Sequence, residues 1–390
     1  MRSMANRLRS FFMLDGGPSR NAAMEGLRGF AVMLVVFIHV IANLCIFHAG
    51  VDISDLSDSL QYARKHSNMK ALLHALSQGH HAVDLFFLLS AFLITRIVAK
   101  QKGTFSYFGY IRKRAVRIYP PFLAALVFAI AVQHWFIHEI PIKNSIIAKN
   151  LLFLHGAPIV GWKFRAYNFP AWSLFYEFSF YIVFPMLFWL WRRSQAVGGS
   201  AGSYMAGVAL LGAILYVHSY MPRAATFFFG IMLGLRSDDE LRRIARGLPT
   251  WLVAGTFSFL CLAYATYSRN FAWFTPFYSV SISMLFLKTC FDEGPLHRLF
   301  TWSPLRGLGN ISYSLYLMNM PVLLLMDRVV PFEKLGPSPA ARGIVYVSMG
   351  IIASIGGAVV LFAVAERWYF RKRQPTPIPA AVPEPLRLAA

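Results

Sequence analysis

Long apolar segments separated by shorter polar connections constrain the fold of this chain more than any other feature. A helix needs roughly 20 apolar residues to cross the ~30 Å hydrocarbon core of a membrane. Because a backbone in lipid must satisfy its own hydrogen bonds, such segments predict helices. We therefore expect an all-α, polytopic membrane bundle of about ten transmembrane helices, by the same length criterion. The segments lie at 27–47, 81–100, 119–138, 170–191, 203–219, 222–236, 249–267, 271–291, 309–330 and 342–364.

The basic residues predict the orientation of the bundle. If the N-terminus lies inside, the inner segments hold more than two thirds of the 38 Lys and Arg residues. Such an excess is typical of the cytoplasmic side, so we expect both termini to be cytoplasmic. The formal net charge of +21 would suggest nucleic acid binding in a soluble protein. Here the basic residues follow the topology, and we expect membrane lipid, not nucleic acid, as the partner.

The two ends of the chain differ in composition from the apolar middle. Residues 1–20 predict a basic segment on the inner membrane surface, residues 21–373 the membrane domain, and residues 374–390 a disordered Pro/Ala-rich tail. Within the long outer connection 139–169, the apolar stretch 146–154 is too short to span and predicts a re-entrant or interfacial helix. The cysteines and the loop histidines lack the spacing of metal sites, so no metal is expected.

Several polar residues fall inside the apolar segments, where each costs a few kcal/mol and is a functional candidate by default. His39, Asp84 and Glu177 are the ionisable ones. At 1.5 Å per residue, His39 lies about 18 Å and Glu177 about 20 Å above the inner edge. Ser90 and Asn319 fall at a similar depth, and Asp84 lies nearer the outer rim. A base, a carboxylate, a hydroxyl and an amide are therefore expected at one level.

Arg28 and His39 share one face of the first predicted helix. Eleven residues correspond to three turns plus about 20°, and to about 16 Å along the axis. A cation below an imidazole suits a long ligand that is anionic at one end and reactive at the other, such as an acyl-CoA. Arg112, Arg114 and Arg117 add cations at the inner surface. They are candidates for binding nucleotide phosphates, or they are only a topology signal.

Five segments together resemble the acyltransferase family 3 membrane proteins, bacterial enzymes that commonly O-acylate extracytoplasmic glycans. They occur in the family's order and cover nearly the whole chain. The segments are EGLRGFA (25–31) leading to His39, VDLFFLLSAFLI (83–94), RKRAVRIYP (112–120), PAWSLFYEFSFY (170–181) and ISYSLYLMNMP (311–321).

This resemblance implies an acyl-CoA donor, most commonly acetyl-CoA, used from the cytoplasmic side of a bacterial inner membrane. The acceptor would be a hydroxyl of an extracytoplasmic or lipid-linked glycan. The resemblance also implies that His39 is essential, with Arg28 as its partner. Trp172, Tyr313 and Asn319 lie in the last two segments and are candidates for binding the acceptor. The chain departs from the family at Asn319, where a histidine is common.

The expected mechanism has His39 as general base toward a sugar hydroxyl that attacks the thioester carbon. Glu177 or Asp84 would fix the imidazole tautomer, and Ser90 or Asn319 would donate to the oxyanion. A covalent acyl-histidine intermediate is the alternative.

Two other classes of function compete with this interpretation. A transporter or flippase would show inverted repeats and broken helices in both halves, and the sequence has no such symmetry. A different multi-span acyltransferase would act on lipid or protein acceptors. The acyl group, the acceptor and homo-oligomer formation stay open.

Overall fold

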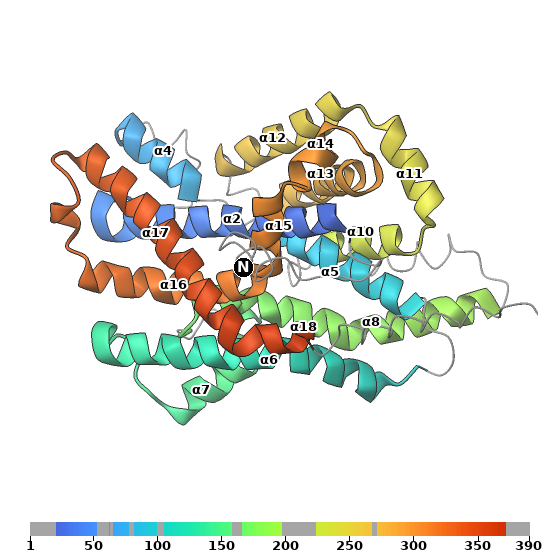
Figure 1. The fold of residues 1–390 in the computed structure, drawn as a ribbon, viewed down its shortest axis with the longest axis horizontal. Coiled ribbons are helices and arrows are strands. Elements are labelled where there is room, and N and C mark those ends of the chain that lie inside the picture. The colour runs from blue at the N-terminus through green and yellow to red at the C-terminus, as the bar shows by residue number, and fades with distance from the viewer. Residues whose placement is uncertain are drawn as a thin grey trace, which may run out of the picture.

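The computed structural model describes residues 21–52, 62, 65–77, 82–99, 105–157, 166–196, 224–266 and 271–371. Within these residues the regular elements are all helical, as Figure 1 shows. The expected terminal segments 1–20 and 374–390, and the expected span 203–219, lie outside the described residues.

Helix α2 (Ala22–Leu44) is the central element of the bundle and packs against α4, α5, α15, α16 and α17 (Figure 1). It begins at Asn21, whose side chain accepts hydrogen bonds from the backbone N–H groups of Ala23 and Met24. This N-cap satisfies donors that the first turn leaves open. The helix continues into the π-turn η1 (Cys45–Ala49), which ends at Gly50 in the left-handed region with φ 59°.

The remaining helices of the first half follow α2 in the chain. The π-turn η2 extends α6, and the short elements α7, η3 and η5 occupy the connection from α6 to α8. These elements are α4 (Asn68–Ser77), α5 (Ala82–Ala99), α6 (Tyr107–Val132), η2 (Gln133–Ile137), α7 (Asn144–Leu151), η3 (Leu154–Gly156), η5 (Phe169–Ala171) and α8 (Trp172–Ala196).

The second half contains the long helices α13, α16 and α17 and, before and between them, shorter helices that turn sharply. These elements are α10 (Ala224–Gly234), α11 (Asp238–Gly247), α12 (Thr250–Thr266), α13 (Phe271–Phe291), α14 (Pro295–Phe300), α15 (Ser303–Asn310), α16 (Ser312–Val329), η7 (Phe332–Lys334), α17 (Pro339–Leu361), η8 (Phe362–Glu366) and α18 (Arg367–Arg371).

Five stretches are long and apolar enough to cross a membrane: Ala22–Ala49, Asn68–Ala99, Tyr107–Ile137, Phe169–Leu190 and Pro339–Phe370. The second of them joins α4 and α5 across residues 78–81, which lie outside the described residues. Two helix pairs reach the same standard only together, α11 with α12, bent by 84°, and α15 with α16, bent by 74°. The described residues therefore hold five candidate spans, or up to seven. The segment expected at 222–236 forms only the 11 residues of α10. The count of ten and the side of the termini stay predictions.

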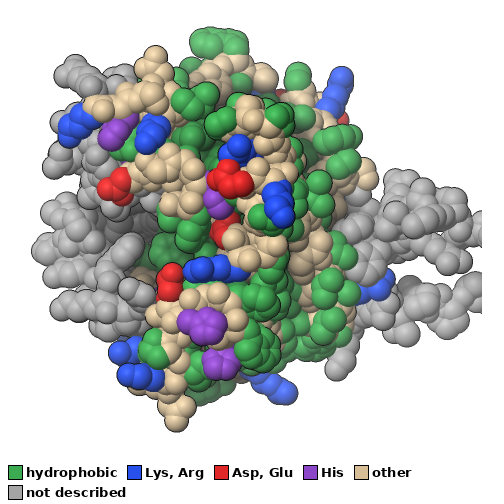
Figure 2. Space-filling model, turned by 90° about the vertical axis from the view of Figure 1, so that its left-hand side faces the viewer, with side chains coloured by type: hydrophobic (Ala, Val, Ile, Leu, Met, Phe, Trp, Pro, Cys, Tyr) green, Lys and Arg blue, Asp and Glu red, His purple; other side chains and the backbone are tan. Residues whose placement is uncertain are grey.

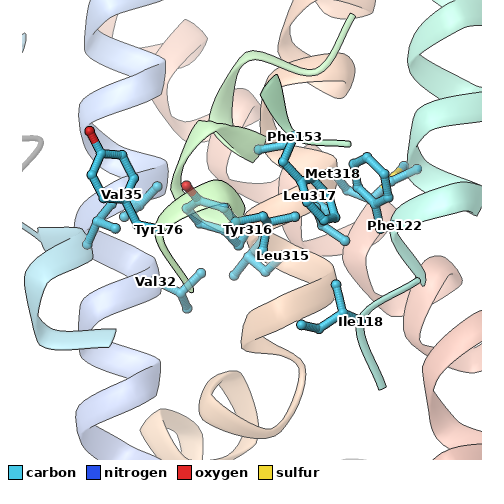
Figure 3. Close-up of a cluster of buried hydrophobic side chains, with 14 of the residues drawn as sticks. Val32, Val35, Ile118, Phe122, Phe153, Tyr176, Leu315, Tyr316, Leu317 and Met318 are labelled. Atoms are coloured by element: carbon cyan, nitrogen blue, oxygen red, sulfur yellow. The ribbon is translucent and has the colours of Figure 1, made fainter. Parts of the chain in front are cut away.

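The apolar core lies where α2, α6, α8 and α16 meet (Figure 3). Val32 and Val35 of α2 face Tyr176 and Tyr316, and Phe122 of α6 packs on Phe153 with ring centroids 4.7 Å apart. These side chains fill the space between helices that carry different motif segments. The core therefore holds the four helices in one fixed arrangement.

Glycines allow α2 to cross α14 and α15 with backbone against backbone. A Cβ at Gly26 would overlap the carbonyl oxygen of Phe300, and one at Gly29 would overlap that of Leu305. A Cβ at Gly309 of α15 would in turn overlap the carbonyl oxygen of Glu25. Small residues are typical of such close helix contacts in membranes. The pair Gly26 and Gly29 thus turns the opposite face of α2, with Arg28, away from this crossing.

Replacing Gly29 with alanine should lower the free energy of unfolding by about 1–3 kcal/mol, because the added methyl group must displace backbone. Gly356→Ala in α17 is the matched control, since nothing lies within 4 Å of a Cβ there. That control should leave stability unchanged or raise it by up to about 1 kcal/mol. Thermal unfolding of both variants in detergent checks this, and equal melting temperatures would contradict the close crossing.

His155 is a buried histidine in η3, in the connection between α6 and α8. It is 7 % exposed, and both ring nitrogens lack a hydrogen-bond partner in the part of the chain that the structure describes. Burial in apolar surroundings lowers its pKa from 6.5 to about 4. The imidazole is therefore neutral in the folded protein at neutral pH.

The pKa of His155 predicts a loss of stability in acid. Between pH 6.5 and about 4 the unfolded chain holds a proton at this ring that the folded chain lacks, so stability falls with falling pH by about 1.4 kcal/mol per unit. From pH 7 to pH 5 the wild-type protein should lose about 2 kcal/mol more than His155→Phe. Denaturation of both proteins at the two pH values measures the difference.

Candidate active site

A cavity of about 140 Å³ lies between α2, α5, α6, α8 and α16, and residues of all five motif segments line it. On α5 its wall runs from Val83 to Ile97, about 21 Å at 1.5 Å per residue. Most of that wall is apolar. The polar residues expected from the sequence that line the cavity are Arg28, Ser90, Arg114, Arg117, Glu177 and Tyr313.

Glu177 lies in this cavity between α5 and α8. Its Oε1 accepts a hydrogen bond of 2.9 Å from the hydroxyl of Ser90 and another from the hydroxyl of Tyr181. Tyr181 lies four residues after Glu177, so both side chains project from the same face of α8. The carboxylate is therefore held in one orientation by neighbours on two helices.

The arginines give the cavity its positive charge. Arg114 is 8 % exposed, and its guanidinium lies over the rings of Tyr110 and Tyr181 at 5.5 and 5.8 Å. The Nε of Arg114 is buried and has no hydrogen-bond partner among the described residues. A buried guanidinium donor without an acceptor favours an anionic ligand, because an unmade hydrogen bond at this position is costly.

Glu366 is a second buried carboxylate near the site, outside the cavity lining, and sequence reasoning missed it. It is 4 % exposed in the π-turn η8, and its Oε2 accepts a 2.6 Å hydrogen bond from Ser314 Oγ. The charges of Arg117 and Arg28 both act on it. The sequence could have indicated Glu366, because it is a carboxylate only two residues beyond the last apolar segment, which ends at residue 364.

His39 is partly buried on α2 and is hydrogen-bonded to Asn319 of α16, with 2.6 Å between Nδ1 and Oδ1. The amide nitrogen of Asn319 donates to the carbonyl oxygens of Leu315 and Tyr316 at 3.0 and 2.7 Å. A flipped amide would place its oxygen against those two carbonyls. Oδ1 must therefore face His39 and accept, so Nδ1 of the neutral imidazole carries the proton.

This geometry leaves Nε2 of His39 with the lone pair that a general base needs. We expected a carboxylate, Glu177 or Asp84, to fix this tautomer. In the structure the imidazole Nδ1–H donates to the amide oxygen of Asn319 instead. Glu177 accepts hydrogen bonds from Ser90 and Tyr181. The reason is that sequence spacing gives the depth of a side chain but not the direction in which its helix is turned.

His39 itself does not line the cavity, in the ranges that the structure describes. The closest connection is through Tyr316, which lines the cavity and whose backbone oxygen accepts from Asn319. The Tyr316 hydroxyl bonds with Ser173 at 2.7 Å. Asn319 thus lies about one helical turn along α16 from Tyr316 in the cavity lining.

The other candidate residues lie outside the cavity lining. Asp84 is 1 % exposed in the first turn of α5. Trp172 begins α8 and packs edge-on against Tyr176 with 5.7 Å between ring centroids. Arg112 is exposed on α6, on a different face from Arg114.

Comparisons with known proteins cover most of the chain. Residues 21–363 match the family model described as "Acyltransferase domain". The chain is 22 % identical over 353 residues to YrhL of Bacillus subtilis (strain 168), whose name describes a peptidoglycan O-acetyltransferase; the match covers 80 % of this chain and 50 % of YrhL. No solved structure matches the chain.

Two further relatives give the same range of similarity. Identity is 23 % over 297 residues to the peptidoglycan O-acetyltransferase OatA of Listeria monocytogenes serovar 1/2a (strain ATCC BAA-679 / EGD-e), covering 65 % of this chain and 46 % of OatA. It is 29 % over 182 residues to the acyltransferase MdmB of Streptomyces mycarofaciens, covering 45 % of this chain and 41 % of MdmB. The chain spans about half the length of YrhL and OatA.

The hydrogen bond between His39 and Asn319 predicts the tautomer of one histidine. With ¹⁵N-labelled histidine, the His39 signal of the wild-type protein at neutral pH should show a protonated Nδ1 and an unprotonated Nε2. Asn319→Leu removes the acceptor, so the Nε2–H form should grow at the expense of the Nδ1–H form. Identical spectra for both proteins would show that Asn319 does not set the tautomer.

Proposed function

Because the chain belongs to the acyltransferase 3 family, we propose that it transfers an acyl group from acyl-CoA to a hydroxyl of an extracytoplasmic or lipid-linked glycan. Acetyl is the preferred group in this proposal. The names of OatA and YrhL make peptidoglycan one candidate acceptor. The coarser statement, that the chain is a multi-pass membrane acyltransferase, follows from the family.

One observation carries the proposal: all five motif segments, which lie up to about 290 residues apart in the chain, line a single cavity. That cavity has arginines from α2 and α6 and an apolar wall on α5. A ligand with phosphates at one end and an apolar or weakly polar chain at the other matches both features. An acyl-CoA has this form.

We place the Arg28 end of the bundle in the cytoplasm of a bacterium, with the inner membrane around it. The support is the excess of basic residues on that side of the expected topology. In this orientation Arg114 and Arg117 bind donor phosphates, for which Arg114 has an unused Nε donor. Glu177 and Glu366 balance the arginine charge while no donor is bound.

In the proposed reaction, Nε2 of His39 takes the proton of the acceptor hydroxyl while the hydroxyl oxygen attacks the thioester carbon. The C–S bond breaks, and the CoA thiolate leaves with the proton from the imidazolium. Asn319 acts as a positioning residue for His39. Of the two expected oxyanion donors, Ser90 lines the cavity, whereas the Asn319 amide nitrogen is engaged by two carbonyls. We therefore assign the oxyanion contact to Ser90, whose single hydroxyl proton must leave its hydrogen bond to Glu177 Oε1 to make that contact.

A transporter or flippase is the alternative function. It has no need of an imidazole with a fixed tautomer next to an arginine-lined cavity. Thioester turnover by the purified protein separates the two, since a flippase would leave acyl-CoA intact.

His39→Ala should lower acyl transfer by at least about 10²-fold, because the general base is lost. Binding of acyl-CoA should persist, since the arginines of the cavity are unchanged. The measurement is ester-bound acyl groups on surface glycans, released by mild alkali and quantified by mass spectrometry, together with acyl-CoA binding in nanodiscs. His134→Ala, at an exposed histidine, is the control and should behave as wild type. Full turnover by His39→Ala would refute the assignment.

A further inference from the structure

A second cavity, of about 250 Å³, opens at the end of the bundle opposite Arg28. Figure 2 looks onto this end, where acidic, basic and histidine side chains lie close together in the middle of the face, among hydrophobic and other side chains. The ends of α2, α6 and α16 and the connection from α6 to α8 form its walls. The lining residues used below are Phe47, Gln133, Glu139, Phe169, Asp327 and Arg328.

Gln133 is a buried polar side chain of this cavity. It is 5 % exposed, and its Oε1 has no hydrogen-bond partner in the described part of the chain. It is the first residue of the π-turn η2, which ends α6 at His138 with a left-handed φ of 64°. The terminal amide turns easily about its last torsion, so it can offer either its oxygen or its nitrogen to a ligand.

Asp327 provides a carboxylate that three neighbours hold in place. It accepts hydrogen bonds from Asn43 Nδ2, from His48 Nε2 at 3.1 Å and from the Tyr346 hydroxyl at 2.6 Å. The His48 ring stacks on Phe332 with centroids 4.2 Å apart. Because these partners come from α2, η1 and α17, the carboxylate is fixed before any ligand arrives.

The rim of the cavity combines charge with exposed aromatic rings. Arg328 and Glu139 face each other at 3.9 Å, and both are about half exposed. Phe47 and Phe169 are 44 % and 52 % exposed. Amide, carboxylate and guanidinium groups beside aromatic faces suit a polyhydroxylated ring, which offers hydroxyls at its edge and C–H groups on its face.

The position of this cavity relates it to the candidate active site. Asn43 follows His39 by four residues on α2, and Asp327 follows Asn319 by eight on α16. At 1.5 Å per residue the cavity therefore lies roughly 6–12 Å beyond the histidine–asparagine pair. That is about the length of one or two sugar rings.

We propose that this cavity is a saccharide subsite for the acyl acceptor, in which Gln133 bonds a sugar hydroxyl and Phe169 packs on a ring face. The occupant places a neighbouring hydroxyl at Nε2 of His39. This inference rests on the proposed function and adds the residues that recognise the acceptor.

The amide oxygen of Gln133, which has no partner among the described residues, allows a direct test of the proposal. Gln133→Leu keeps the shape and removes the polar group, so the melting temperature of the full chain in detergent should stay the same or rise. Glycan acylation in cells should fall about five- to tenfold, as the loss of one ligand hydrogen bond predicts. Hydrolysis of acetyl-CoA by the purified protein, which needs only the donor site, should be unchanged.

Two further variants keep the test independent of that one substitution. Phe169→Ala should lower glycan acylation with the same unchanged acetyl-CoA hydrolysis. Trp135→Ala, at an exposed aromatic residue of η2 outside the cavity lining, is the matched control and should acylate as wild type.

The outcomes separate the subsite from the function. Wild-type glycan acylation by both Gln133→Leu and Phe169→Ala, with His39→Ala inactive, would overturn the subsite and leave the enzyme assignment intact. A wild-type chain that neither hydrolyses acetyl-CoA nor acylates glycans would overturn the proposed function, and the subsite with it.

Discussion

The contact on which the rest of the structure depends is the crossing of α2 with α14 and α15, where backbone meets backbone at Gly26, Gly29 and Gly309. A helix in lipid gains little from apolar burial against its neighbours, so close packing must hold it. This crossing fixes the rotation of α2 about its own axis. One rotation brings Arg28 to the cavity and His39 to Asn319, and any other would separate both from their partners.

Charge inside the bundle is the second constraint. Each ionised group in a low-dielectric interior needs a partner, and the partners here come from distant helices. Arg117 interacts electrostatically with Glu177 and Glu366, and Glu366 also interacts with Arg28. These opposite charges act on one another while the cavity holds no ligand. An anionic ligand therefore enters a site whose arginines are already in place. Its negative charge takes over part of the role that the carboxylates have in the empty cavity.

Six of the eleven candidate residues from the sequence line the cavity, and five, His39 among them, do not. The motif segments and the helical spacing identified Arg28, Ser90 and Glu177, because both are local properties of the sequence. The pairing of His39 with Asn319 joins residues 280 apart in the chain, and periodicity carries no information on such contacts. Arg112 shows the same limit, since it lies in the right motif but on the exposed face of α6. Membership of the family is confirmed, whereas the number of spans stays a prediction.

Three π-turns lie beside the polar clusters in the described residues: η1 with His48, η2 with Gln133 and η8 with Glu366. A π-turn contains one residue more than regular α-helix needs. In η1 and η2 the turn closes the end of a helix, at Gly50 and at His138, which both have left-handed backbones with φ 59° and 64°. The wider turn places the side chains of His48, Gln133 and Glu366 at helix ends, far from the crossing glycines, so the polar groups there can change without disturbing the contact that fixes α2.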